Sequence, residues 1–273
     1  MFKARLLSSI VLVVAALAAI LPGGYFLAAV LFVISFIGCS ELYRACGIHE
    51  EGKKINALEA AGYLSIVLYY GAIVFGEEAE LQMIAVIFAL VAFMFVYVFR
   101  FPEYHAEQVM SAFFGLVYAP VMISFIYMTR ELEYGIYVVW LIFISSWICD
   151  TCAYLTGSAI GRHKLTPRLS PKKSIEGAVG GVLGAMIVGG LYGLLVAEKS
   201  GQSPGMAGAF VVISGVGAVV AQVGDLAASA IKRNHQIKDY GRLIPGHGGI
   251  MDRFDSVIFT APMIYALAVM LMD

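Results

Sequence analysis

The chain alternates long apolar segments with short polar connections. Its apolar runs cover residues 6–22, 25–42, 56–75, 80–99, 107–129, 134–156, 175–196, 206–231 and 253–272. Each run has about the length that crosses the hydrocarbon core of a bilayer as an α-helix, roughly 17–25 residues. Helices are favoured there because lipid offers no partner to the backbone N–H and C=O groups. The pattern therefore predicts an all-α, polytopic integral membrane protein with about nine transmembrane helices.

Composition agrees with this prediction. Of the 273 residues, 60% are hydrophobic and 14% are charged, whereas a soluble domain is nearer half apolar and a quarter charged. The four cysteines lie in or beside apolar runs, so they do not form a secreted disulfide framework. The first run follows Lys3 and Arg5 and could be taken for a signal peptide. A second run begins directly after Pro22-Gly-Gly, and a helical hairpin is the better interpretation.

The distribution of positive charge predicts the orientation. With the N-terminus in the cytoplasm, 16 of the 18 Lys and Arg residues fall in cytoplasmic segments, and only Arg130 and Lys199 fall outside. Cytoplasmic loops of membrane proteins carry such an excess of Lys and Arg. A wrong number of spans would have mixed the two sets, so the split also supports nine helices.

The polar residues divide the chain into two predicted regions. The connections 157–174 and 232–252 are longer and richer in charge than the others, and both lie in the C-terminal half. We expect residues 1–130 to be a transmembrane scaffold and residues 131–273 to be the catalytic region with these two cytoplasmic loops. There is no convincing internal repeat, which weakens an inverted-repeat transporter interpretation.

Charged and hydroxyl side chains gather where the eighth run becomes polar. Asp225, Ser229 and the pair Lys232/Arg233 are spaced so that they share one face of a helix. A carboxylate and a hydroxyl one turn apart can approach the same cation, and the basic pair lies where phosphates would be. Charge of this kind at a membrane helix is costly and usually functional.

A second group of carboxylates opens the last run. Asp252 and Asp255 are three residues apart, near the positive end of the predicted helix dipole. Mg²⁺ prefers oxygen ligands and often takes one or two carboxylates together with substrate phosphates. We expect a Mg²⁺ site built from Asp225, Asp252 and Asp255. The structural alternative is that these carboxylates cap the helix and form salt bridges to Arg253 or Arg233.

Two loops offer phosphate-binding chemistry. The turn Pro245–Gly249 has glycines that allow a close approach of the backbone to a ligand, and it could hold an anion before a helix N-terminus. His247 in that turn is either a hydrogen-bonding loop residue or a base. In the other loop, Ser170-Pro-Lys172-Lys173 places cations beside hydroxyls, which suits phosphates at the headgroup level. If these cations only kept the loop in the cytoplasm, fewer of them would be needed.

Three further features have structural explanations. Cys149 and Cys152 form a CxxC pair, which in a membrane helix is more typical of small-residue packing than of metal or redox chemistry. The glycines of the run 175–196 form overlapping GxxxG patterns that allow neighbouring helices to approach closely. Glu41 is expected to snorkel to the interface, with a functional role as the alternative. The roles of Asp150 and Glu176 stay open.

These residues resemble the motif of the CDP-diacylglycerol synthases, or phosphatidate cytidylyltransferases. The matching positions are Ser229-Ala-Ile-Lys232-Arg233, Lys238-Asp239 and Pro245-x-His247-Gly-Gly-x-x-Asp252-Arg253-x-Asp255, which span 27 residues. Upstream, Asp150-Thr-x-Ala-Tyr154-x-x-Gly157 and Ser170-Pro-Lys-Lys-Ser-x-Glu176-Gly also resemble that family. The resemblance covers roughly residues 145–273, and the first half of the chain matches only in its helical character.

The resemblance implies the reaction CTP + phosphatidic acid → CDP-diacylglycerol + pyrophosphate, with Mg²⁺ required and a second cation left open. It also implies a homodimeric polytopic protein among membrane lipids, with a role in phospholipid synthesis. The charge distribution places the expected active site on the cytoplasmic side of the inner (plasma) membrane. Because the sequence has no nucleic-acid motif, we expect no nucleic acid as partner. The residues expected to act in catalysis are Asp225, Asp252, Lys232 and Arg233. The residues expected to bind substrate phosphates are Ser170, Lys172, Lys173, Ser229, Lys238, His247 and Arg253.

Other functions remain alternatives at this point. A CTP-dependent polyprenol or lipid kinase would share the helical architecture and the phosphate chemistry, but not the 27-residue motif. An ion-coupled transporter would place its charges near the bilayer midplane, whereas here they gather at the cytoplasmic ends. A CDP-alcohol phosphatidyltransferase would carry a DGxxAR run, which is absent from the sequence.

Overall fold

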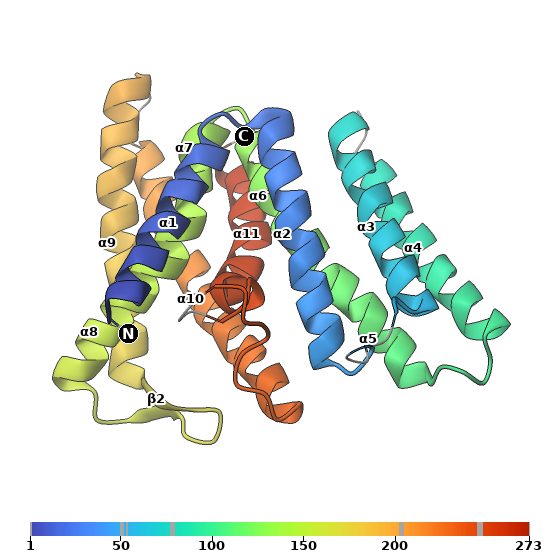
Figure 1. Ribbon diagram of the computed structural model, residues 1–273. Helices are drawn as coiled ribbons and strands as arrows, with labels where there is room; N and C mark the ends of the chain where they lie inside the picture. The colour runs from blue at the N-terminus through green and yellow to red at the C-terminus, as the bar shows by residue number, and fades with distance from the viewer. Residues whose placement is uncertain are drawn as a thin grey trace. The chain divides into compact units, whose positions relative to one another are not determined.

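A computed structural model describes residues 2–49, 52, 54–76, 80–201, 205–244 and 248–272, with residues 2–10 described by their backbone alone. The described chain is almost entirely helical (Figure 1). Its elements are α1 (Phe2–Ile20), α2 (Gly24–Ala45), α3 (Ala57–Phe75), α4 (Glu80–Phe99), α5 (Ala106–Leu116), η1 (Val117–Val121), α6 (Met122–Arg130), α7 (Gly135–Phe143), η2 (Ile144–Ile148), α8 (Cys149–Ile160), β1 (Lys164–Thr166), β2 (Ser170–Ser174), α9 (Ile175–Ser200), α10 (Gly205–Asn234) and α11 (Met251–Met272).

The all-α prediction is confirmed. Each predicted span corresponds to one helix, or to one continuous stack of helical segments, and the boundaries differ by at most four residues. Within the described residues, eight of these helices are long and apolar enough to cross a membrane. The remaining helix is α1, in which the apolar stretch Val11–Ile20 is shorter than the other eight. The protein is therefore a multi-pass membrane protein.

Two of the spans contain a π-helical turn. In the span 106–130, the turn η1 contains Pro120, which has no N–H to donate and disturbs the regular helical ladder. In the span 135–160, the turn η2 contains Ser145 and Ser146, both buried. The Ser146 hydroxyl donates to the Ile142 carbonyl at 2.7 Å. Neither turn interrupts its span.

The chain forms two compact units, which we describe separately. The first contains residues 1–127 and 235–253, and the second contains residues 128–234 and 254–273. In the first unit, Tyr43 of α2 is fully buried and its hydroxyl donates to the Ala112 carbonyl of α5 at 3.0 Å. Gly62 and Gly115 leave room for the Tyr43 ring, because a Cβ at either position would meet it closer than 3.0 Å. Glycines thus allow α3 and α5 to approach α2.

The connections of the first unit meet at one end of its helices. Asn56 caps α3 by accepting from the Glu59 N–H at 2.9 Å, and Glu59 accepts from the Asn56 N–H at 2.9 Å. The next N–H, of Ala57, donates to the Tyr104 hydroxyl at 3.1 Å. The α2–α3 and α4–α5 connections therefore lie side by side, as the alternation of membrane helices requires.

The second unit is built around α9, which packs against α8 and α10 (Figure 1). A Cβ at Gly180 or Gly184 would clash with Thr156 or Cys152 of α8. On the other side, a Cβ at Gly189 would clash with Ser214 of α10. The prediction that the glycines of this helix allow close approach is confirmed.

A feature that the sequence did not predict closes the α8–α9 connection. Strands β1 and β2 pair antiparallel, with Lys164 opposite Ser174 and Thr166 opposite Ser170. Ser174 then caps α9 by accepting from the Gly177 N–H at 3.2 Å. The Lys-rich segment is thus a hairpin strand that leads directly into a helix.

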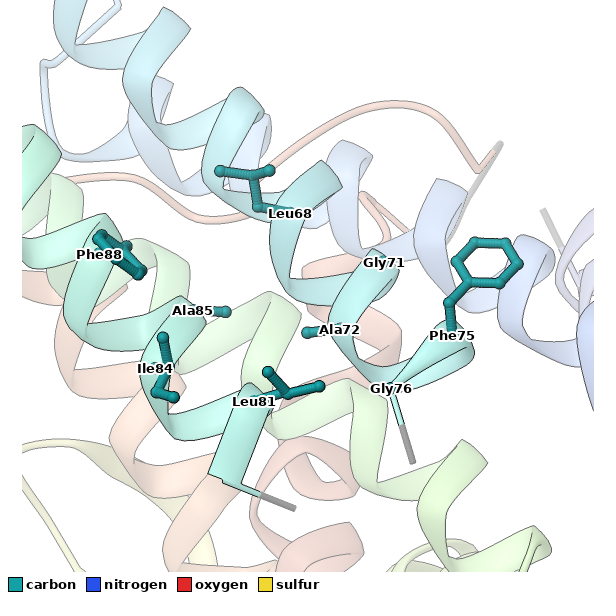
Figure 2. A pocket seen from close by; sticks show the side chains of 9 residues that line it. All are labelled: Leu68, Gly71, Ala72, Phe75, Gly76, Leu81, Ile84, Ala85 and Phe88. Carbon is teal, nitrogen blue, oxygen red and sulfur yellow. The ribbon is translucent and has the colours of Figure 1, made fainter. Parts of the chain in front are cut away.

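An apolar groove of about 380 Å³ lies between the C-terminal half of α3 and the first turns of α4 (Figure 2). Its lining consists of Leu68, Gly71, Ala72, Phe75, Gly76, Leu81, Ile84, Ala85 and Phe88. None of these side chains carries a charge or a hydroxyl, so the groove offers no group to a phosphate. It belongs to the strongly apolar surface of α4, most of which is exposed in the described chain.

Candidate active site

The second unit brings together two of the predicted cytoplasmic charges. The Lys173 ammonium of β2 forms an ion pair with the Asp225 carboxylate of α10, and both side chains are about one-quarter exposed. Lys173 comes from the hairpin and Asp225 from the polar end of a long helix. The structural alternative had assigned the salt bridge of Asp225 to Arg233 or Arg253, and the structure assigns it to Lys173.

Asp255 of α11 interacts electrostatically with the same group. Its half-buried carboxylate is within electrostatic range of Asp225, Lys232 and Asp150. It also accepts from the Ser256 N–H at 2.8 Å. Gly224, next to Asp225, has no side chain, so α10 can approach the backbone of Asp255 and the ring of Phe259. The second unit therefore gathers the acids Asp225 and Asp255 with the cations Lys173 and Lys232.

Glu176 fixes the base of the hairpin that carries Lys173. Its carboxylate accepts from the backbone N–H groups of Arg162 and His163, at 3.1 and 3.2 Å. The carboxylate is also 2.6 Å from the Nδ1 atom of His163. The Ile175 N–H donates to the His163 carbonyl at 2.9 Å. Glu176, whose role the sequence left open, thus ties the start of the hairpin to the first turn of α9.

The first unit holds the other predicted carboxylate. Asp252 is 5% exposed, and its Oδ2 atom accepts from the N–H of Tyr240 at 2.8 Å and from that of Gly249 at 3.0 Å. Gly248 adopts φ +85°, a conformation that favours glycine, and a Cβ there would lie 2.7 Å from this oxygen. Asp252 therefore organises the loop before α11, in addition to any role that it has with a metal.

Glu41 contributes to the same loop, and the expectation that it snorkels is wrong. The side chain is 1% exposed and accepts from the N–H of Ile250 at 3.1 Å and from that of Met251 at 2.9 Å. A carboxylate buried in this way would be unstable without such donors. The sequence alone did not predict the hydrogen bonds from Ile250 and Met251 to Glu41. It does contain one signal. The side chain of Ile250, which precedes α11, has no acceptor, so another residue must cap the helix.

The glycine-rich turn approaches carboxylates of the protein itself. The Gly249 backbone lies against Glu41, and the N–H groups of Gly249, Ile250 and Met251 donate to Glu41 and Asp252. These three groups are therefore engaged within the protein. Of the predicted anion cradle 245–249, the N–H of Gly249 already donates to Asp252, and residues 245–247 are not described. His247 lies outside the described residues.

The remaining predicted phosphate-binding residues differ in exposure. Lys172 of the hairpin, Arg233 at the end of α10 and Lys238 in the following loop are exposed. Ser170, Ser229 and Lys232 are half-buried. The Nε atom of Arg253 is buried and has no hydrogen-bond partner among the described residues. Their roles stay predictions.

The donor set suits a divalent cation that also binds phosphates. Within the described residues, there is no group of three or more His, Cys, Asp or Glu side chains that could hold a metal alone. Two carboxylates in one unit, Asp225 and Asp255, match the one or two that Mg²⁺ commonly takes from a protein when phosphates complete its coordination. The chemistry of these residues therefore fits the expected ion.

The CxxC pair has the packing role that the sequence predicted. Cys149 is fully buried and receives a hydrogen bond from the Gln222 amide at 3.4 Å. Cys152 packs against Gly184, and both cysteines are free thiols. Gln222 also donates to the Ala178 carbonyl at 3.1 Å, so it links α10 to both α8 and α9.

Comparison with known proteins identifies a family model and several relatives that match this chain. A model of the cytidylyltransferase family matches residues 3–271. The chain is 32% identical to the phosphatidate cytidylyltransferase of Staphylococcus saprophyticus over 268 residues, which cover 98% of this chain and 99% of the relative. It is 30% identical to that of Staphylococcus epidermidis over 269 residues, with the same coverage. It is 36% identical to that of Thermotoga maritima over 151 residues, which cover 55% of this chain and 56% of the relative.

Proposed function

The chain belongs to the cytidylyltransferase family and is a nucleotidyltransferase, and we propose that it converts CTP and phosphatidic acid to CDP-diacylglycerol and pyrophosphate. The observation that carries this proposal is the match to phosphatidate cytidylyltransferases over nearly the whole chain, including the motif 229–255. This match supports neither of the two alternative functions, a lipid kinase or an ion-coupled transporter.

The reaction presents an electrostatic problem. A phosphate oxygen of phosphatidic acid forms a bond to the α-phosphorus of CTP, and the bond from that phosphorus to the leaving pyrophosphate breaks. The attacking group is already an anion, so the enzyme does not need a strong base. It must bring two anions together and hold them in line, which positively charged groups accomplish by neutralisation and positioning.

The basic residues of the two cytoplasmic loops suit this task. We assign phosphate binding to Lys172, Lys173, Lys232, Arg233 and Lys238, together with the hydroxyls of Ser170 and Ser229. Arg253 and His247 complete the proposed set. The Nε of Arg253, which has no hydrogen-bond partner among the described residues, supports its place in this set.

Mg²⁺ is the cofactor that the carboxylates fit. Asp225 and Asp255 are the proposed ligands in the second unit, and a metal-binding role for Asp252 stays a prediction from the sequence. When bound, the ion would neutralise charge on the phosphates of CTP. The ion pair of Lys173 with Asp225 supports this proposal, because it shows that Asp225 accepts a cationic partner at that position.

The proposed setting is a homodimer in the inner (plasma) membrane with its active site facing the cytoplasm. The relatives named above are bacterial proteins. The 16-to-2 division of Lys and Arg between the two sides supports the orientation. Light scattering of the detergent-purified protein would test the dimer, with a monomer mass as the contradicting result.

A product assay tests the reaction. Purified protein receives phosphatidic acid and CTP labelled in its α-phosphate and cytidine. We expect a labelled CDP-lipid and unlabelled pyrophosphate. A lipid kinase would instead leave the label in soluble CDP and produce a phosphorylated lipid from an alcohol acceptor. Absence of label from the lipid, with Mg²⁺ and both substrates at saturation, would refute the proposal.

A further inference from the structure

Helix α11 begins without a capping side chain of its own. Its first residue is Met251, and the position before it is Ile250, which has no oxygen or nitrogen in its side chain. The first N–H groups of a helix have no partner within the helix and must be satisfied by other groups. Buried N–H groups without a partner would be costly, because this end of α11 is shielded from water.

Glu41 of α2 supplies the missing cap from more than 200 positions away. Its Oε1 atom accepts from the Ile250 N–H at 3.1 Å, and its Oε2 atom accepts from the Met251 N–H at 2.9 Å. A carboxylate in this position also interacts favourably with the positive end of the helix dipole. Arg44, one turn further along α2, is within electrostatic range of Glu41 and offsets part of its charge.

The surrounding backbone is shaped to this carboxylate. A Cβ at Gly241 or at Gly249 would clash with the Glu41 carboxyl group, so both positions require the absence of a side chain. On the neighbouring α2 surface, Gly38 leaves space for the Met251 side chain, whose sulfur would lie 3.1 Å from a Cβ at that position. The loop and the first turn of α11 are therefore fitted to α2 at several points.

Asp252 depends on the same arrangement. It follows Met251 directly, and its Oδ2 atom binds the N–H groups of Tyr240 and Gly249. Glu41 and Asp252 thus accept from four backbone donors, three in the loop and one at the start of α11, and a displacement of Ile250 and Met251 would displace Asp252. We propose that Glu41 is a positioning residue for the reaction, because it fixes the start of α11 and thereby the place of the Asp252 carboxylate. This inference rests on the proposed function.

The substitution Glu41→Gln tests the proposal with little change of volume. Both oxygens of Glu41 accept hydrogen bonds, whereas a glutamine presents one acceptor and an NH₂ group that would face an N–H donor. Glu59→Gln is the matched control. Glu59 is also 1% exposed in the first unit and also accepts a backbone N–H, but it serves the start of α3.

The experiment measures kcat per folded molecule and hydrogen exchange of the segment 240–253 in the full-length, detergent-purified protein. We expect Glu41→Gln to accelerate exchange in this segment and to lower kcat about 10- to 100-fold, the scale of a small misplacement of a reacting group. Glu59→Gln should leave both unchanged relative to wild type. If the glutamine variant does not fold, Glu41→Asp retains the charge with a shorter reach and should show smaller changes in the same directions.

A double variant separates positioning from general stability. If Glu41 acts through Asp252, the variant Glu41→Gln/Asp252→Asn should be no slower than Asp252→Asn alone, because the two effects share one cause. Multiplied rate losses would overturn the proposal, as would a normal kcat for Glu41→Gln or an equal loss for Glu59→Gln. A wild-type protein without CDP-lipid product would instead refute the proposed function itself.

Discussion

Lys173 and Asp225 form an ion pair between the hairpin strand β2 and the helix α10. The pair joins the two motifs that the sequence analysis treated as separate phosphate-binding and metal-binding groups. Asp255 is within electrostatic range of the same carboxylate, and Lys232 offsets part of the repulsion between the two acids. The hairpin is thus joined to Asp225 of α10 through the Lys173 ammonium group.

The substitution Lys173→Gln should impair catalysis without changing topology. It removes the cation closest to Asp225 and a proposed phosphate contact, so we expect kcat/KM for CTP to fall about 10-fold or more, a transition-state loss of ~1.4 kcal/mol or more. In the absence of CTP, Mg²⁺ should bind more tightly to the variant, because an ammonium group no longer competes at Asp225. Steady-state kinetics and calorimetric Mg²⁺ titration measure the two effects.

Lys164→Gln is the control for this experiment. Lys164 lies on strand β1 of the same hairpin and is exposed, so the variant removes a hairpin charge without touching the ion pair. We expect normal kinetics for both substrates. Wild-type kinetics for Lys173→Gln would leave that lysine with only a topological role.

We expect substitutions of the carboxylates Asp225 and Asp252 to have the largest effects on turnover. Asp225→Asn and Asp252→Asn should each lower kcat by at least about 100-fold, the scale of losing one electrostatic element of an active site. Both proteins should fold, since an asparagine oxygen can still accept the backbone bonds that Asp252 accepts. Turnover at saturating Mg²⁺ measures the effect, and Glu198→Gln on the exposed surface of α9 is the control. A variant that keeps near-normal turnover would remove its residue from the proposed metal site.

The helices could be predicted because the bilayer restricts their length. An apolar run long enough to cross the hydrocarbon has few other stable conformations. The glycines of α9 were equally informative, since a residue without a side chain at every third or fourth position marks a close helix contact. The hairpin 164–174 was not predicted, because its two short strands carry no alternating apolar pattern.

Candidate site residues could be selected from the sequence by residue type, but their pairings could not be predicted. Asp225 was selected because a membrane helix rarely carries a charge without a function, and Lys173 because it is a cation beside serine hydroxyls at the headgroup level. Their ion pair depends on how α9 and α10 pack, and no local spacing encodes that. Glu41 was misjudged for the same reason, because its partners Ile250 and Met251 are about 210 positions away and contribute only their backbone.

The orientation can be tested with reporter fusions. We expect a reporter after Asp273 to lie outside the cytoplasm and one inserted in the hairpin, between Thr166 and Ser170, to lie in the cytoplasm. The reason is the excess of Lys and Arg on one side of the predicted spans. A paired phosphatase and fluorescent-protein reporter distinguishes the two sides. A cytoplasmic C-terminus would refute the nine-span topology, although the assigned site residues could stand.

The last prediction concerns the contact between α8 and α9. A Cβ at Gly180 would meet three atoms of the Thr156 side chain closer than 3.0 Å, and Thr156 is β-branched and has little freedom to turn away. We therefore expect Gly180→Ala to destabilise the protein by about 1–3 kcal/mol, as overpacking typically does.

Gly208→Ala is the matched control for this contact, since a Cβ at Gly208 of α10 would meet nothing within 4 Å. Thermal unfolding of the detergent-purified variants should show a lower midpoint for Gly180→Ala and an equal or higher midpoint for Gly208→Ala, because alanine favours a helix more than glycine does. Since α9 begins at the end of strand β2, separation of α8 from α9 should also disturb Lys173. Equal midpoints for the two variants would show that the α8–α9 contact is looser than the structure indicates.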